Sequence, residues 1–283
     1  MNSETPLKIA IQGVRASFHD VAAQQVFKNQ SIHAVECASF ALLGKALSDQ
    51  RADFAMMAIE NSIAGSILPN YSLLQSHGFK ILGETYLRIE MAIMAMPGQK
   101  LQDLKYVQSH PMAILQCQDF LNTLPHVKVV EASDTAESAL EISKRGLKEY
   151  GAIASKLAAE TYGLEVLKTN IETDRSNYTR FLTLCRRENY QKPNGANKAS
   201  LKFEAKHEPG SLAKVLTLFS EHKLNMTKIQ SLPILGKPYQ YAFHVDIEWS
   251  DDALYETAMN RLGRETINLV HFGEYPRAEK PTV

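Results

Sequence analysis

Short apolar runs alternate with helix-spaced apolar stripes along the first 187 residues of the chain. The runs at 7–12, 32–37 and 54–59 are nearly continuous, which is typical of strands that are buried on both faces. In the segments between them, apolar residues recur every third or fourth position, as on one face of a helix, and the first such segment begins at the capping residue Ser17. Strands that alternate with helices predict an α/β fold with a largely parallel sheet.

This alternation occurs twice, which predicts two lobes. The first series ends in strands at 79–82 and 85–96, and the second of these is long enough to cross between lobes. The second series begins after Pro97-Gly98, with a helix from Pro111 to residue 121. Its predicted strands are 106–108, 127–130 and 151–155. We expect a two-lobed domain over 1–187, with a first lobe of about 1–84 plus 178–187, a second of about 85–177, and a cleft between them.

The C-terminal part has a different order of elements. Residues 188–198 are polar and contain Pro193 and Gly195, which indicates a linker. Residues 199–277 then predict strand, helix, strand, strand, helix and strand, which is the α+β ferredoxin-like order.

Composition excludes several classes of protein. The formal net charge is +0, so no overall field attracts nucleic acid or an anionic membrane. No apolar run approaches the roughly 20 residues of a membrane span, and the first residues lack the pattern of a secretory signal. The 3 cysteines are widely spaced and none of the 9 histidines falls in a metal-binding pattern. We expect a cytoplasmic protein with free thiols and no metal.

Candidate chemistry lies at the ends of predicted strands, where α/β proteins place functional groups. Asn61 and Ser62 directly follow the apolar run that ends at residue 59. Thr179, Arg180 and Phe181 put a hydroxyl, a cation and a ring on consecutive positions of another strand. Because side chains alternate along a strand, Thr179 and Phe181 should share one face and Arg180 the other.

Several stretches together resemble the prephenate dehydratase family, across nearly the whole chain. The most specific are the I-E-N-S, S-H-P and N-x-T-R-F segments, in this order and spacing. The stretches are 13–19 (GVRASFH), 59–65 (IENSIAG), 107–117 (VQSHPMAILQC), 134–136 (DTA), 151–155, 162–164 and 174–181 (DRSNYTRF). The resemblance implies a periplasmic-binding-protein type II-like catalytic domain followed by an ACT regulatory domain.

The activity that the resemblance implies is the decarboxylation and dehydration of prephenate to phenylpyruvate, by a carbon–oxygen lyase of phenylalanine biosynthesis that uses no cofactor. Thr179 would be the proton donor. The implied substrate-binding residues are Ser17, Asn61, Ser62, Ser109, His110, Gln116, Arg180 and Phe181. Arg180 has two alternative roles, because its predicted face allows it either to bind a carboxylate or to brace the strand. Two other functions remain open: arogenate dehydration, or amino-acid binding by a sensor without catalysis.

The resemblance also implies feedback inhibition by L-phenylalanine, bound between the ACT domains of a homodimer or homotetramer. The implied effector residues are Gly210, Ser211, Leu212, Asn225, Met226, Gln230 and Ser231. The chain departs from the family pattern at Ala16, where glycine is usual, and at Gln230-Ser231-Leu232-Pro233, where the family has Glu-Ser-Arg-Pro. The second departure removes a possible ion pair from the effector site.

Overall fold

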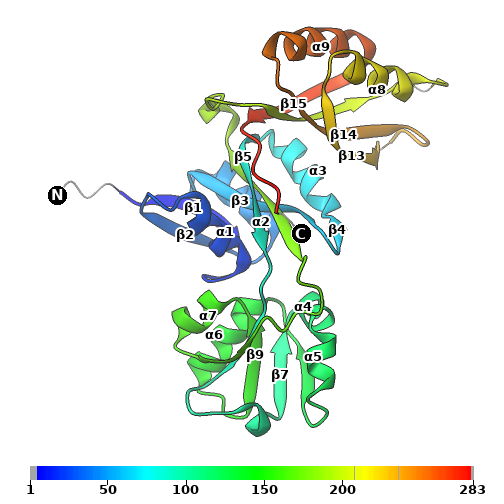
Figure 1. The fold of residues 1–283 in the computed structure, drawn as a ribbon. Coiled ribbons are helices and arrows are strands. Elements are labelled where there is room, and N and C mark those ends of the chain that lie inside the picture. The colour runs from blue at the N-terminus through cyan, green and yellow to red at the C-terminus, as the bar shows by residue number, and fades with distance from the viewer. Residues whose placement is uncertain (1–4, 207, 235, 282–283) are drawn as a thin grey trace. The chain divides into compact units, whose positions relative to one another are not determined.

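The computed structural model describes residues 5–206, 208–234 and 236–281. The chain forms two compact units (Figure 1). Among the described residues, unit 1 contains 5–73, 85–182 and 280–281, and unit 2 contains 74–84 and 183–279 except for residues 207 and 235. Three elements pass from one unit into the other: α3 (Leu68–His77), β5 (Lys80–Arg88) and β11 (Tyr178–Cys185).

The first lobe of unit 1 is built on a sheet with the strand order β2-β1-β3-β11-β5, with β4 beside β3. Its other strands are β1 (Leu7–Gln12), β2 (Ile32–Cys37), β3 (Phe54–Asn61) and β4 (Gly65–Ser66), and its first two helices are α1 (Phe18–Val26) and α2 (Phe40–Ser48). β1 pairs in parallel with both β2 and β3, as the apolar runs predicted. Buried Ile9, Met56 and Phe181 belong to one core cluster, so β11 is tied to the strands that precede it in the chain by more than a hundred residues.

The second lobe has a sheet with the order β10-β6-β9-β7-β8. Its strands are β6 (Ala92–Ala95), β7 (Tyr106–Ser109), β8 (Lys128–Glu131), β9 (Tyr150–Ala154) and β10 (Glu165–Thr169), and its helices are α4 (Pro111–Gln116), α5 (Gln118–Asn122), α6 (Thr135–Arg145) and α7 (Lys156–Tyr162). Successive residues of β6 enter different cores: Ile93 joins one cluster, Ala92 and Met94 the other. Figure 1 shows α4 and α5 on one face of this sheet and α6 and α7 on the other.

Three predicted elements differ from the structure. The strands expected at 79–82 and 85–96 are instead β5 and β6, separated by residues 89–91. Just past β5, the N–H of Ile89 still donates to the backbone carbonyl of Asn177 (2.8 Å), beside the start of β11, whereas the N–H of Met91 donates to the side-chain carboxylate of Glu172 (3.0 Å). The two chain segments that cross between the lobes are therefore hydrogen-bonded to each other. The helix expected from Pro111 to residue 121 is broken at Cys117, which separates α4 from α5.

Unit 2 contains the predicted order of strand, helix, strand, strand, helix and strand. The elements are β12 (Lys198–Glu204), α8 (Ser211–Glu221), β13 (Asn225–Pro233), β14 (Tyr241–Glu248), α9 (Asp252–Glu265) and β15 (Ile267–Tyr275). The sheet order is β13-β14-β12-β15 and its pairings are antiparallel. Both helices cover the same face (Figure 1). The predicted mixed α/β fold class is confirmed, and no described helix has the length and apolar character needed to cross a bilayer.

Candidate active site

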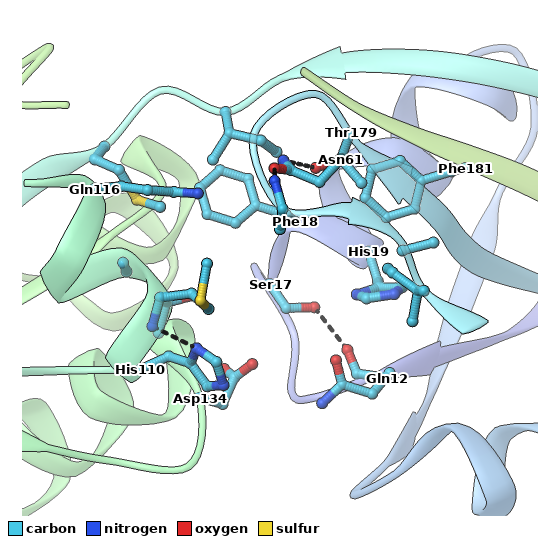
Figure 2. A pocket seen from close by; sticks show the side chains of 18 of the residues that line it. Gln12, Ser17, Phe18, His19, Asn61, His110, Gln116, Asp134, Thr179 and Phe181 are labelled. Atoms are coloured by element: carbon cyan, nitrogen blue, oxygen red, sulfur yellow. Dashed lines mark hydrogen bonds between the residues drawn. The ribbon is translucent and has the colours of Figure 1, made fainter. Parts of the chain in front are cut away.

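A cavity of about 260 Å³ lies between the two lobes of unit 1 (Figure 2), and we call it the interlobe cavity. The first lobe contributes the end of β1, the start of α1, the loop after β3 and the start of β11, and the second lobe contributes the starts of α4 and α6. Its polar lining residues are Gln12, Ser17, His19, Asn61, His110, Gln116, Ser133, Asp134, Thr135 and Thr179. Its remaining walls are apolar and include Phe18, Phe40, Ile67 and Phe181. Such a cavity suits a small ring-containing molecule with a few polar groups.

The hydroxyl of Thr179 is held by a chain of side-chain amides that runs from one lobe to the other. Asn61 Nδ2 donates to Thr179 Oγ1 (3.0 Å) and to Asn177 Oδ1 (2.7 Å). Asn177, which is fully buried, in turn donates from Nδ2 to Gln116 Oε1 on α4 (2.9 Å). Because Thr179 accepts a hydrogen bond from Asn61, its own proton remains available for a ligand in the cavity.

The alternation predicted along β11 is present. Thr179 and Phe181 line the interlobe cavity, whereas Arg180 does not and is 4 % exposed. The guanidinium of Arg180 faces Glu60, with 3.9 Å between Nη1 and Oε2. Of the two alternative roles for Arg180, this placement favours bracing the strand.

Ser17 occupies the N-cap of α1, after a tight turn. Its hydroxyl accepts from the N–H of Asp20 (3.4 Å) and donates to the carbonyl of Gln12 (3.3 Å). Ala16, where the family pattern has glycine, adopts a left-handed conformation with φ 63°. The Asp20 carboxylate accepts from the N–H of Ala16 (2.7 Å), which helps to hold a conformation that alanine disfavours.

His110 and Asp134 lie on the second lobe's side of the cavity, each at a helix N-cap (Figure 2). His110 Nδ1 accepts from the N–H of Met112 (3.2 Å), so the neutral ring carries its proton on Nε2. Asp134 Oδ1 accepts from the N–H groups of Ala136 (2.8 Å) and Glu137 (3.0 Å). Burial raises the pKa of the Asp134 carboxyl, and the two backbone donors and His110 oppose that rise.

His19 lies on the first lobe's side and is neutral. Its ring packs edge-on against Phe181 (5.0 Å between centroids, 88° between planes) and obliquely against Phe40 (5.4 Å). Burial lowers its pKa from 6.5 to about 3. Its Nε2 is buried without a hydrogen-bond partner among the described residues.

Not every residue predicted for the site lines the cavity. Ser17, Asn61, His110, Gln116, Thr179 and Phe181 do, whereas Ser62, Ser109 and Arg180 do not. Ser62 Oγ donates to the carbonyl of Ser176 and accepts from the N–H of Tyr178 (both 2.9 Å), so it joins the loop after β3 to the start of β11. Ser109 is fully buried and donates to the carbonyl of Ile153 (2.6 Å). Both hydroxyls therefore form hydrogen bonds to backbone atoms and hold separate segments of the chain together.

Five polar lining residues were not predicted for the site: Gln12, His19, Ser133, Asp134 and Thr135. All but Ser133 had a signal in the sequence. Gln12 ends an apolar run, and His19 closes the G-V-R-A-S-F-H stretch. Asp134 begins the D-T-A segment just after β8, at the end of a parallel strand. The D-T-A segment is part of the family resemblance, but the sequence assigns no role in the site to the Asp134 side chain.

A second cavity, of about 560 Å³, lies within unit 2 at the start of α8. Its walls include Gly210, Ser211 and Leu212 from the predicted effector residues, together with the aromatic side chains of Tyr239, Tyr241 and Phe243. Asn225, Met226, Gln230 and Ser231 belong to β13 and do not line it. The structure therefore brings together only the first of the two predicted effector segments.

Known proteins resemble this chain in both sequence and fold. The sequence model of the family described as prephenate dehydratase matches residues 9–189. A chloroplastic arogenate dehydratase/prephenate dehydratase of Arabidopsis thaliana is 35% identical over 280 residues, which are 95% of this chain and 73% of the relative. The crystal structure of prephenate dehydratase from Arthrobacter aurescens in complex with L-Phe has a TM-score of 0.85 at 26% identity, over 98% of this chain and 92% of that one. A structure described as a quorum-quenching acylase, GqqA, has a TM-score of 0.86 at 32% identity, over 96% of this chain and 98% of that one. The family match covers the segments that form the interlobe cavity, and the chain belongs to the prephenate dehydratase family of enzymes.

Proposed function

We propose that this enzyme converts prephenate to phenylpyruvate and that Thr179 donates the proton to the departing ring hydroxyl. The observation that carries this proposal is the hydrogen bond from Asn61 Nδ2 to Thr179 Oγ1 (3.0 Å) at the cavity wall. It orients the threonine so that its O–H can be donated to a substrate. The amide chain through Asn177 to Gln116 supports this orientation from the second lobe.

The proposed reaction needs one proton and accurate placement. The bond between the ring and its carboxylate breaks, CO₂ leaves, and the electron pair enters the ring. The bond between the ring and the hydroxyl oxygen breaks, the oxygen keeps its pair and takes the Thr179 proton, and a proton taken up from solvent then restores the Thr179 hydroxyl. The products are phenylpyruvate, CO₂ and water. Because formation of an aromatic ring drives the reaction, a weak but well-placed acid is sufficient.

The other polar lining groups supply hydrogen bonds to the substrate. Gln116 Oε1 already accepts from Asn177, so its Nε2 is the group left to bind a carboxylate. The Nε2–H of His110, on the second lobe's side of the cavity, and the Ser17 hydroxyl, on the first lobe's side, are further candidates. Ser62, Ser109 and Arg180 act through positioning, because their side chains do not line the cavity.

The geometry favours dehydration over amide hydrolysis, the activity in the GqqA description. An acylase that used a serine or threonine nucleophile would need the hydroxyl hydrogen-bonded to a general base. Within the described lining of the cavity, no hydroxyl is hydrogen-bonded to an imidazole: Ser17 donates to the backbone carbonyl of Gln12, and Ser133, which is exposed, donates to the carboxylate of Glu137, an exposed residue that does not line the cavity. Thr179 accepts from an amide, which cannot take its proton.

The test is phenylpyruvate formation from prephenate by the purified full chain at neutral pH, where the spontaneous acid-driven reaction is slow. Arogenate is assayed in parallel, since it carries an amine in place of the side-chain keto group. A folded enzyme that turns over neither substrate refutes the proposal. Tight binding of an amino acid without turnover of either substrate would favour a sensor.

We further propose that residues 1–187 are the catalytic domain, 188–198 the linker and 199–277 an ACT regulatory domain that binds L-phenylalanine. The second cavity supports this proposal, because aromatic side chains line it beside the start of α8, where free N–H groups can bind a carboxylate. The assay is inhibition by phenylalanine, together with light scattering to distinguish a homodimer from a homotetramer. Activity that is unchanged at millimolar phenylalanine contradicts the regulatory role.

A further inference from the structure

The negative charge of the interlobe cavity is concentrated on one residue. Among the described residues that line the cavity, Asp134 is the only acidic one, and none is lysine or arginine. Prephenate carries two carboxylates, so a lone acidic group in its site needs an explanation. The cap of α6 does not provide one, because asparagine would cap a helix equally well.

Asp134 keeps one oxygen available. Oδ1 accepts both backbone N–H bonds of the cap, from Ala136 and Glu137. Oδ2 has no hydrogen-bond donor among the described residues, and it lies beside Gly13, where an added Cβ would be 2.9 Å from it. The absence of a side chain at Gly13 therefore leaves room on that side of the carboxylate.

The position of Asp134 matches one end of the substrate. Figure 2 shows Thr179 and Asn61 at one end of the pocket and His110 and Asp134 at the other. In prephenate and arogenate, the ring hydroxyl and the side chain are attached to opposite corners of the ring. When the hydroxyl meets Thr179, the side chain therefore extends toward Asp134. The keto or amino group of that side chain is the sole difference between the two substrates.

We propose that Asp134 selects between the two substrates by binding the ammonium group of arogenate. This inference rests on the proposed function and extends it to a substrate with an amino side chain. A carboxylate and an ammonium make a charge-assisted hydrogen bond, which is roughly twice as strong as a neutral one. The same carboxylate repels the carboxylates of either substrate, and only the ammonium of arogenate offsets that repulsion, because the keto group of prephenate offers Asp134 no proton.

The test is the ratio of kcat/KM for arogenate to kcat/KM for prephenate in the wild type and in Asp134→Asn. Asparagine keeps the helix cap but removes the charge, so the variant separates the two roles of Asp134. We expect the ratio to fall at least tenfold, with arogenate kcat/KM decreasing and prephenate kcat/KM unchanged or increased. Glu131→Gln is the matched control, since Glu131 is an exposed carboxylate of the same lobe outside the cavity, and its ratio should remain that of the wild type.

Three results have distinct meanings. A ratio in Asp134→Asn within twofold of the wild type, or an equal loss for both substrates, overturns the inference. Wild-type turnover of prephenate without any turnover of arogenate also overturns it, while the proposed function stands. Wild-type turnover of neither substrate refutes the proposed function itself.

Discussion

Replacement of Thr179 by valine tests the proton donor with little change of shape. Valine removes the hydroxyl and keeps the branched side chain on β11. Loss of a general acid costs about 10²–10⁴-fold in kcat, or about 2.7–5.5 kcal/mol of transition-state stabilisation. The cost in stability should be small, because Asn61 Nδ2 keeps Asn177 Oδ1 as an acceptor at 2.7 Å and no buried donor is left without a partner. We expect the free energy of unfolding to change by about 1 kcal/mol or less.

The assay combines phenylpyruvate formation under saturating prephenate with urea unfolding of the same samples. Thr183→Val is the matched control: it makes the same chemical change on the same strand, at a buried position that does not line the interlobe cavity. Thr179→Ser should retain most of the activity, since it keeps a hydroxyl. A folded Thr179→Val enzyme with kcat within threefold of the wild type would refute the role of Thr179 and the reasoning from the amide chain.

Three further predictions concern the groups around the site and the packing of unit 2. Arg180→Met should lower the free energy of unfolding by about 1–3 kcal/mol and change KM less than threefold; a large rise in KM without loss of stability, seen by urea unfolding and kinetics together, would support substrate contact instead. The folded pKa of His19 is about 3, below its ordinary 6.5, so the unfolded chain binds the extra proton and stability falls as pH decreases from about 6.5 toward 3. This single group costs about 2 kcal/mol at pH 5 relative to neutral pH, and urea titrations should show a smaller acid loss for His19→Phe; equal losses would contradict the assigned burial. Gly273→Ala would place a Cβ 2.3 Å from the carbonyl oxygen of Ile81, so it should destabilise by about 1–3 kcal/mol, whereas Gly263→Ala on α9 has room and should not; thermal melts of the two variants make the comparison.

The local pattern of apolar and polar residues was sufficient to predict most of the fold. Alternating runs and stripes predicted the strands and helices of both lobes, because their periods of about two and 3.6 residues reflect burial on a strand or a helix face. It failed where a distant contact sets the boundary. The segment 85–96 alternates and then becomes apolar, which predicts one long strand, but residues 89–91 bond to Asn177 and to the Glu172 carboxylate, which no local window contains. Lys198 shows the same limit: it was assigned to the polar linker, yet it is 1 % exposed in β12 and ion-paired with Glu84 (2.9 Å).

For the site, the residue types could be predicted from the sequence, but the directions in which their side chains point could be predicted only in part. The alternation along β11 correctly separated Arg180 from Thr179, since direction along a strand follows from position. Loops give no such rule, so the Ser62 hydroxyl could not be recognised as a link to Tyr178. Asp134 was missed for a different reason. A good cap explained the residue fully at the level of sequence, and its second oxygen acquires meaning only beside Gly13 and the cavity.

Under the two proposals, the two ends of the interlobe cavity have different roles. At the Thr179 end, the proposed proton donor is a hydroxyl and its hydrogen-bond partner is a side-chain amide. No group at that end therefore needs to change its charge with pH near neutrality. At the Asp134 end lies the one acidic group of the described lining. A variant that alters the charge at Asp134 should therefore change which substrate reaches the reactive geometry and leave the rate of the bound substrate largely intact. A variant that alters Thr179 should do the opposite, lowering kcat for both substrates by the same factor. If both variants instead lowered kcat for both substrates, the two ends would not act independently, and the separation of proton donation from selection would be wrong.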